Sequence, residues 1–347
     1  MKLPTGTSES LSIMRAFAMV SIILCHYVHW IERIAWVGQF LNVGVPVFFL
    51  ISGFLYGHKN ISDFKTWFIQ RYLKIMIPIW VYCLVTTFVL GIIGKLGMPK
   101  PLGTLITILG CQGVISGGGG IGNVVVGHLW FISFILLSYG ITPLLQMFIT
   151  RLEIREFFIL LILSLLILNS YVLFIPNPGM WVWLPGCLVY VVGYYLGKYH
   201  IQSYTHMKKL LLVCANIGII LICIAIRLLA KHLLDSPQNT LSSQCYSRVI
   251  AIDTHCCLAI AFFVIALLAL QQFNRLRKRL FGLTKILSDY SFEIYIVHYM
   301  FLTGVLSCSN ITSNIFLNTF FAISIIIIST MFLKTLAKLP KRLLTNA

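Results

Sequence analysis

Charged residues are scarce in this sequence. Only 10% of the 347 residues are Asp, Glu, Lys or Arg, whereas an ordinary soluble domain has roughly 25%. Because a soluble chain with so few charges could not cover its surface with polar groups, this composition excludes a soluble globular protein. A hydrophobic share of 59% and a mean hydropathy of +0.93 indicate that much of the surface faces lipid.

Acidic residues are the rarer charged group, with 9 Asp and Glu against 26 Lys and Arg and a formal net charge of +17. Such an excess is typical of some nucleic-acid-binding proteins. Here, however, the basic residues are interleaved with apolar runs and form no continuous stripe. We therefore expect no nucleic-acid partner, and we interpret these cations as loop charges that fix membrane topology.

Motifs for metal and nucleotide binding are also missing. The ten cysteines include no Cys-x-x-Cys pair and no Cys/His cluster at zinc spacing, so we expect no metal site. The glycine run at residues 117–120 is not followed by Gly-Lys-Ser/Thr, which excludes a phosphate-binding loop of that kind. We expect this run to lie in a long outer loop.

Long apolar runs are abundant, and they lack the two-residue alternation of membrane β-strands. An apolar helix of about 20 residues crosses the hydrocarbon core of a bilayer. We predict an all-α fold: a polytopic bundle of about ten transmembrane helices that forms one membrane-embedded domain over residues 1–347, with no separate soluble domain. The predicted spans are residues 11–30, 41–57, 72–94, 128–149, 156–175, 181–197, 209–230, 248–270, 290–307 and 314–337.

Lys and Arg are distributed unevenly between the loops that join these spans. With the N-terminus inside, the cytoplasmic segments hold 19 of them and the outer segments hold 6, Arg227 among the latter. Because cytoplasmic loops carry the excess of cations, this asymmetry predicts that both termini are cytoplasmic.

Ionisable side chains inside a span are candidates for function, because a charge at the bilayer centre costs at least roughly 2.5–3.5 kcal/mol. Arg15 and His26 lie eleven residues apart in the first span. Eleven helical steps end about 20° past three full turns, so both side chains share one face, about 16 Å apart along the axis. Snorkelling to the headgroups is the alternative for Arg15, and packing against a neighbouring helix is the alternative for His26.

Polar residues also mark the second and fourth spans. Ser52 precedes Gly53, a pair that is equally consistent with a close contact between helices. His128 and Trp130 open the fourth span at the outer face, where Trp is typical of the membrane interface. We treat Ser52, His128 and Trp130 as candidates for substrate binding.

Two cations, Arg71 and Lys74, lie three residues apart at the cytoplasmic start of the third span. They project from one helix face, where together they could bind the phosphates of a soluble cofactor. Anchoring of the span by cytoplasmic cations is the alternative explanation.

The ninth span contains the last group of candidates. Asp289 lies at its cytoplasmic end, and Glu293, Tyr295 and His298 follow it. Glu293 and His298 are deep enough in the bilayer to need polar partners.

Taken in order, these segments resemble the acyltransferase-3 family of membrane O-acyltransferases, over about residues 8–305. The family's first-span pattern, an arginine followed by ten residues and a histidine, is matched by Arg15 and His26. Its other motifs are matched by Phe-Phe-x-x-Ser-Gly-Phe at residues 48–54, Arg71 before Pro78, Trp130-Phe131, and Ile294-Tyr295-x-x-His298. Lys74 stands where the family usually has a second arginine; lysine keeps the charge but lacks the planar fork.

The resemblance implies transfer of an acyl group, most often acetyl, from cytoplasmic acyl-CoA to a hydroxyl of an envelope glycan. A lipid-linked glycan such as lipopolysaccharide O-antigen, in a bacterial inner membrane, is the expected acceptor. We expect Arg71 and Lys74 to bind the CoA phosphates, and Arg15 to bind the donor. His26 would act as general base or transient acyl carrier.

Two further expectations complete this scheme, and one alternative function stands against it. Glu293 or Asp289 would orient an imidazole or neutralise Arg15, and Tyr295 and His298 would join the substrate site. A proton-coupled transporter or flippase of a glycan or lipid-linked sugar is the alternative, because buried His, Arg and Glu suit a proton pathway equally well. Binding of CoA would distinguish the two functions.

Overall fold

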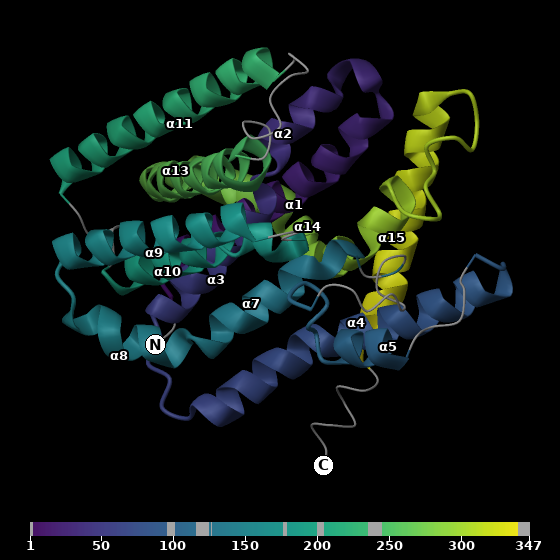
Figure 1. Cartoon of the computed structure of the whole chain (residues 1–347), viewed down its shortest axis with the longest axis horizontal. Coiled ribbons are helices and arrows are strands. Elements are labelled where there is room, and N and C mark those ends of the chain that lie inside the picture. The colour runs from purple at the N-terminus through teal and green to yellow at the C-terminus, as the bar shows by residue number, and fades with distance from the viewer. Residues whose placement is uncertain are drawn as a thin grey trace. The chain divides into compact units, whose positions relative to one another are not determined.

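The computed structural model describes residues 3–95, 101–115, 125, 127–175, 179–199, 205–234 and 245–338. These residues form helices and connecting turns without any strand, which confirms the all-α prediction. The glycine run at residues 117–120 lies outside them. The helices are α1 (Thr5–Tyr27), α2 (Gly38–Leu41), α3 (Gly44–Gly57), α4 (Phe64–Ile92), α5 (Pro101–Ile108), α7 (Trp130–Gly140), α8 (Thr142–Phe148), α9 (Ile154–Phe174), α10 (Gly186–Lys198), α11 (His206–Leu234), α13 (Ala251–Gln272), α14 (Asn274–Leu302) and α15 (Ile315–Leu336) (Figure 1).

Each range predicted to span the membrane is helical over most of its length. Within the described part of the chain, seven helices are long and apolar enough to cross a bilayer, and the bent pair Gly127–Gly140 and Thr142–Phe148 gives an eighth candidate. Helix α10 has only 13 residues, and the first half of α14 is rich in cations. A count of ten spans and the cytoplasmic location of both termini therefore stay predictions.

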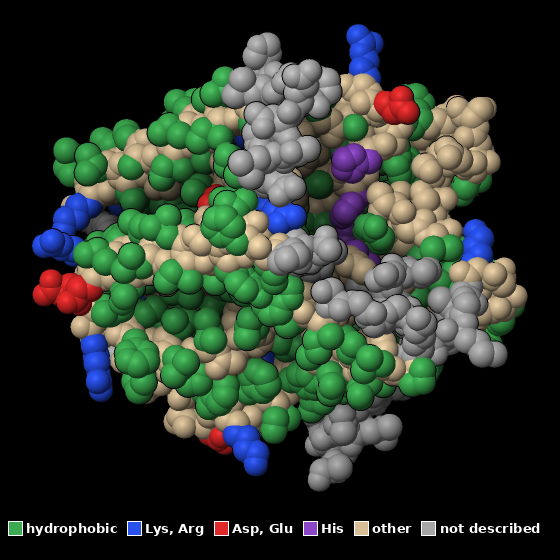
Figure 2. Space-filling model, viewed as in Figure 1, with side chains coloured by type: hydrophobic (Ala, Val, Ile, Leu, Met, Phe, Trp, Pro, Cys, Tyr) green, Lys and Arg blue, Asp and Glu red, His purple; other side chains and the backbone are tan. Residues whose placement is uncertain are grey.

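Apolar side chains dominate the surface of several long helices. Ile167 of α9, Leu211 of α11 and Phe316 of α15 are 67%, 75% and 82% exposed. Figure 2 shows hydrophobic side chains spread over most of the face in view, with few Lys, Arg, Asp or Glu side chains among them. Because such surfaces would be unfavourable in water, they face lipid, and the protein is an integral membrane protein.

The chain folds into two compact units. The first contains residues up to Ala18, Asn42–Ser62 and Gly140–Lys285; the second contains Met19–Leu41, Asp63–Tyr139 and the chain from Ile286 onward. Helices α1 and α14 each contribute one part to either unit.

The first unit is built around helices α3 and α10, which lie side by side (Figure 1). A Cβ atom on Gly53 would overlap the Tyr190 carbonyl oxygen, and one on Gly193 would overlap the Leu50 carbonyl oxygen. The contact is thus reciprocal, with backbone packed on backbone from both helices. Close approach through small residues is a common way to pack helices in lipid. The predicted close contact at Gly53 is confirmed, with α10 as its partner.

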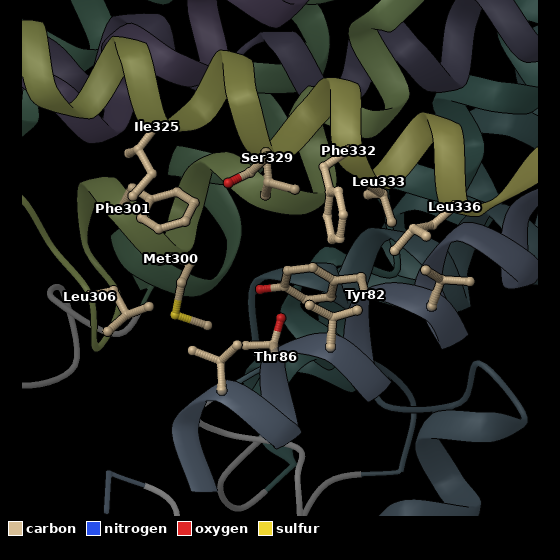
Figure 3. Close-up of a pocket in the computed structure, with 14 residues that line it drawn as sticks. Tyr82, Thr86, Met300, Phe301, Leu306, Ile325, Ser329, Phe332, Leu333 and Leu336 are labelled. Carbon is tan, nitrogen blue, oxygen red and sulfur yellow. The ribbon is translucent and has the colours of Figure 1, made fainter. Parts of the chain in front are cut away.

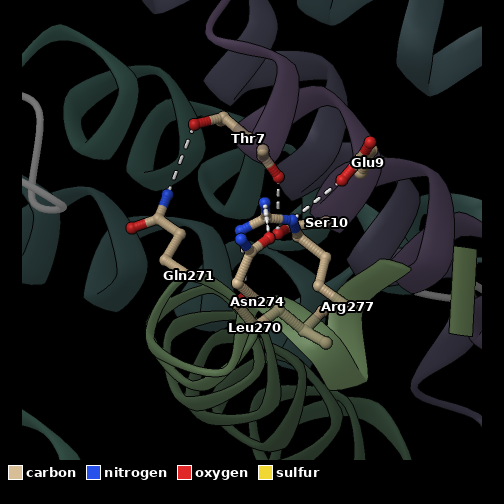
Figure 4. Close-up of polar contacts among 8 residues, drawn as sticks. Thr7, Glu9, Ser10, Leu270, Gln271, Asn274 and Arg277 are labelled. Carbon is tan, nitrogen blue, oxygen red and sulfur yellow. Dashed lines mark hydrogen bonds and ion pairs between the residues drawn. The ribbon is translucent and has the colours of Figure 1, made fainter. Parts of the chain in front are cut away.

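A polar clamp in the first unit joins the start of α1 to the start of α14 (Figure 4). Arg277 Nε lies 2.8 Å from Glu9 Oε2, with only 13% and 16% of the two side chains exposed. The same guanidinium donates through Nη2 to Asn274 Oδ1 at 2.5 Å. Beside it, Gln271 Nε2 donates to Thr7 Oγ1 at 3.3 Å. Arg277, expected to be a loop cation, is instead part of the packed helical structure.

Arg227 is not the outer-loop cation that the charge distribution predicts. The residue lies inside α11 and is only 1% exposed. Its Nε donates to Thr254 Oγ1 at 2.9 Å, and its Nη2 donates to the Ala251 carbonyl at 3.0 Å. This buried arginine is hydrogen-bonded to α13 and helps to hold α11 and α13 together. It therefore does not belong in the count of loop cations that predicts topology.

Candidate functional site

Three histidines from distant segments of the chain meet in the second unit. His26 lies in the last turn of α1, His128 in the short 3-10 helix Gly127–Leu129, and His298 near the end of α14. The ring centroids of His26 and His298 are 5.3 Å apart, and those of His128 and His298 are 5.9 Å apart. Tyr299 contacts two of them: it stacks on His128 at 4.7 Å and meets His26 edge-on at 5.3 Å. We call these four residues the histidine cluster.

His298 is the most buried member of the cluster, with 1% of its surface exposed. Its Nδ1 donates to the carbonyl oxygens of Tyr295 at 2.8 Å and Ile294 at 3.1 Å, within its own helix. In a neutral imidazole with a proton on Nδ1, Nε2 is an acceptor. That Nε2 atom is buried and has no hydrogen-bond partner among the described residues. A buried acceptor without a partner is a place for a proton or a ligand group.

His128 is fixed to α14 through both its side chain and its backbone. Its Nε2 donates to the Ile296 carbonyl at 2.8 Å, while the Tyr295 hydroxyl donates to the His128 carbonyl at 2.8 Å. Tyr82 of α4 meets the imidazole edge-on at 6.3 Å and donates its hydroxyl proton to the Val125 carbonyl at 3.2 Å. This network holds His128 in place against His298 and Tyr299.

His26 differs from the other two histidines because neither of its ring nitrogens hydrogen-bonds to a described residue. Its surroundings are nevertheless well anchored. The hydroxyl of the next residue, Tyr27, lies 2.8 Å from Thr319 Oγ1, and Trp30 Nε1 donates to the Leu302 carbonyl at 2.6 Å. The half-buried imidazole of His26 is therefore held in position by its neighbours, while no described residue occupies the hydrogen-bonding capacity of its ring nitrogens.

Histidine side chains reach the surface of the molecule in a group. Figure 2 shows them in purple, gathered at one place on the face in view. Although three histidines meet in the cluster, no three His, Cys, Asp or Glu side chains in the described part of the chain are placed to hold a metal ion.

Arg15 and Ser52 belong to the first unit and are half-buried. Arg15 lies on the same unbroken helix as His26, α1, which confirms the helical spacing on which their pairing was based. Over eleven residues an α-helix rises about 16 Å. Ser52 lies one residue before the glycine contact between α3 and α10.

The two acidic candidates lie on α14. Glu293 is 9% exposed and makes no hydrogen bond or ion pair with any described residue. Its side chain projects about 140° round the helix from that of His298, five residues later. Asp289 is exposed. Backbone carbonyls, and not these carboxylates, orient His128 and His298.

Arg71 and Lys74 lie inside α4 and not at its start, which corrects the sequence analysis. The helix begins at Phe64, where the Asp63 carboxylate accepts a hydrogen bond from the Thr66 amide at 3.1 Å. Hydrogen bonding to Thr66 also holds the pKa of Asp63 below its usual value. Because α4 begins at Phe64, two to three turns of helix precede the cation pair. Arg71 is half-buried and Lys74 is exposed.

Trp130 opens α7 and is half-buried, with its ring 6.0 Å from that of Phe134. The neighbouring Phe131 meets the Tyr295 ring edge-on at 5.6 Å. The Trp-Phe segment thus packs beside the residues that support the cluster.

Tyr82 and Tyr299 are not among the residues that the sequence predicts for the site. Tyr299 follows His298 directly, and its adjacency to a buried histidine could have indicated it. Tyr82 carries no such signal, because it is one of 15 tyrosines in the chain and lies within an apolar run.

Comparison with known proteins matches residues 8–337 to the acyltransferase-3 family, described as an acyltransferase domain. The matched region includes every residue of the histidine cluster and every other site candidate. No curated protein and no solved structure matches the chain. Since the match covers nearly the whole sequence, the protein belongs to the acyltransferase-3 family and is a membrane acyltransferase.

Proposed function

We propose that the protein transfers an acetyl group from cytoplasmic acetyl-CoA to a hydroxyl of an envelope glycan, in a bacterial inner membrane. One observation carries the proposal: in a chain of the acyltransferase-3 family, the His26 ring makes no hydrogen bond to a described residue and lies 5.3 Å, centroid to centroid, from the buried His298 ring. Acyl transfer to a hydroxyl needs a base that accepts the hydroxyl proton, and an imidazole serves as a base near neutral pH.

In the proposed reaction, His26 accepts the proton of the acceptor hydroxyl while the hydroxyl oxygen attacks the thioester carbonyl carbon. A carbon–oxygen bond forms and the carbon–sulfur bond breaks. The leaving sulfur takes the proton from the imidazolium, so the products are an acyl ester and free CoA. General base catalysis of this kind contributes about 10²–10⁴-fold to the rate. The alternative is that His26 carries the acyl group, and an acylated enzyme trapped without acceptor would identify that route.

The other candidates have roles that follow from charge and position. Arg71 and Lys74 bind the CoA phosphates, and Arg15 binds the thioester oxygen. Glu293 or Asp289 orients an imidazole or neutralises Arg15. Ser52, Trp130 and Tyr295 complete the acceptor side. The assignments of Arg15, Ser52, Arg71, Trp130 and Tyr295 also rest on the family's motifs, whereas those of Lys74 and the two acidic residues rest on charge and position alone.

Binding of acetyl-CoA to the purified protein is the first test. We expect saturable binding by the wild type and loss of binding in an Arg71→Ala/Lys74→Ala double variant. A Lys59→Ala/Lys65→Ala double variant is the matched control, because it removes two charges from the neighbouring exposed positions. An equal loss of acetyl-CoA binding in both variants would show that binding depends only on net charge. Arg71 and Lys74 would then have no specific role at the donor site.

Absence of binding at millimolar acetyl-CoA, by protein shown to be folded, would overturn the proposed donor. It would favour a transporter or flippase of a lipid-linked sugar, in which His26 relays a proton. No observation in the structure favours that function over acyl transfer, and membership of an acyltransferase family favours the latter.

A further inference from the structure

The second unit contains an apolar cavity of about 260 Å³ between α4, α14 and α15 (Figure 3). Its walls are almost entirely hydrocarbon, and the polar groups on them are hydroxyls. No Lys, Arg, Asp or Glu lines it. The hydroxyl-bearing residues are Tyr82, Thr86 and Ser329, and Figure 3 shows them among Met300, Phe301, Phe332 and their neighbours.

The cavity wall combines buried and exposed side chains. Tyr82, Met300 and Leu333 are 6%, 2% and 4% exposed, whereas Val89 of α4 and Phe332 of α15 are 39% and 53% exposed. Because both helices are candidate membrane spans, the exposed part of the wall faces the bilayer.

The cavity adjoins the histidine cluster through Tyr82. The Tyr82 ring lines the cavity and also meets the His128 ring edge-on, with 6.3 Å between the ring centroids. A molecule in contact with Tyr82 would therefore be separated from His128 by a single side chain.

The physical character of the cavity limits what can occupy it. Apolar walls bind water weakly, so the almost entirely apolar lining favours a hydrocarbon occupant over water. Without a cation on its walls it has no group to bind the phosphates of CoA. Its exposed part, which faces the bilayer, admits a chain that arrives from lipid, whereas a donor delivered by CoA arrives from water.

We propose that this cavity binds the hydrocarbon chain of a lipid-linked acceptor and so places the acceptor's polar end at the histidine cluster. The proposal rests on the proposed function, which supplies the acceptor. Lipid tails are as apolar as the cavity walls, so the chain gains packing and not hydrophobic free energy on entering. The cavity therefore acts on acceptor binding and positioning more than on the chemical step.

The test uses the full-length protein in lipid nanodiscs and a polyprenyl phosphate with a diazirine in its chain. We expect light-induced adducts on residues of the cavity wall, and competition by unlabelled polyprenyl phosphate. Ser329→Trp fills the cavity and should lose most of this labelling. Ser324→Trp is the matched control, because Ser324 is also half-buried on α15 but does not line the cavity.

Three outcomes would overturn the proposal. They are equal labelling by a diazirine phospholipid of the same membrane, unchanged labelling in Ser329→Trp, and competition by octanoyl-CoA, which would assign the cavity to the donor's acyl chain. Acetyl-CoA binding measured on the same samples separates the two proposals. Donor binding without cavity labelling overturns the cavity alone, while labelling without donor binding overturns acetyl-CoA as donor and retains a site for a lipid chain.

Discussion

The imidazoles of His26 and His298 lie 5.3 Å apart, centroid to centroid, although 272 positions separate them in the chain. One belongs to the end of the first long helix and the other to the next-to-last. The His26 ring makes no hydrogen bond to a described residue, and the neighbouring His298 ring has a buried Nε2 atom without a hydrogen-bond partner among the described residues. The pair provides a base and a neighbouring site for the proton that the base removes.

Replacement of His26 by alanine or glutamine should lower acetyl transfer by about 10²–10⁴-fold, because neither side chain can accept the hydroxyl proton. The measurement is incorporation of labelled acetyl into the glycan fraction of membranes, at matched protein levels. His29→Ala is the control, since His29 lies one turn later and is exposed. Activity near that of the wild type in either His26 variant would remove this residue from the mechanism.

His298→Ala should lower kcat by less than His26→Ala does and leave the KM for acetyl-CoA unchanged. The substitution removes the buried Nε2 acceptor, whereas the residues assigned to the donor stay in place. Steady-state kinetics at several donor concentrations would separate the two constants. A large rise in KM with unchanged kcat would show that His298 serves donor binding instead.

Tyr295→Phe should destabilise the protein by about 1–3 kcal/mol, because it leaves the buried His128 carbonyl without the hydroxyl that binds it. The thermal unfolding midpoint in mild detergent is the readout. Tyr171→Phe, at a 47% exposed tyrosine that makes no hydrogen bond through its hydroxyl to a described residue, should leave the midpoint unchanged. Equal midpoints for the two variants would mean that this bond contributes nothing to stability.

Gly53→Ala should prevent close packing of α3 on α10, because the added methyl group would overlap the Tyr190 carbonyl oxygen. We expect a loss of folded protein after extraction, measured by size-exclusion chromatography. The control is Gly218→Ala in α11, where a Cβ meets nothing within 4 Å. Alanine there should be neutral or slightly stabilising, since alanine favours a helix interior over glycine by about 1 kcal/mol.

The clamp between α1 and α14 should show direct coupling between Glu9 and Arg277. A double-mutant cycle with Glu9→Gln and Arg277→Gln should give an interaction free energy of about 0.5–3 kcal/mol. Unfolding in mixed micelles provides the four stabilities. Lys278→Gln, at the exposed next position, should show no coupling to Glu9→Gln. An interaction free energy near zero for the Arg277 cycle would contradict the clamp.

The sequence predicts the helices well because span length and hydropathy are local properties. The pairing of Arg15 with His26 on one helix needs only the geometry of α1, and the structure confirms that helix as unbroken. The position of Gly53 in a close contact is predictable for the same reason. Its partner α10 is not, because two apolar helices in lipid carry no local signal that says which of them will meet.

Polar residues inside the helices are harder to assign. From its position near the end of an apolar run, Arg227 is expected to be a loop cation. The structure shows instead that it is buried and hydrogen-bonded to Thr254 and Ala251. Arg71 and Lys74 mark the start of an apolar run, whereas α4 begins at Phe64 because Asp63 caps it. The Tyr299 stack on His128 depends on tertiary packing between two segments far apart in the chain.

The reciprocal glycine contact between α3 and α10 has a consequence for biosynthesis. Helix α3 ends at Gly57 and α10 begins at Gly186, so roughly 130 residues are translated between them. At 5–20 residues per second, α3 waits roughly 6–26 s for its partner. During that interval the glycine-containing face of α3 is unpaired and could pack against a wrong helix, including one from another nascent chain. An insertase or chaperone that shields this face until α10 emerges would raise the yield of correctly assembled protein.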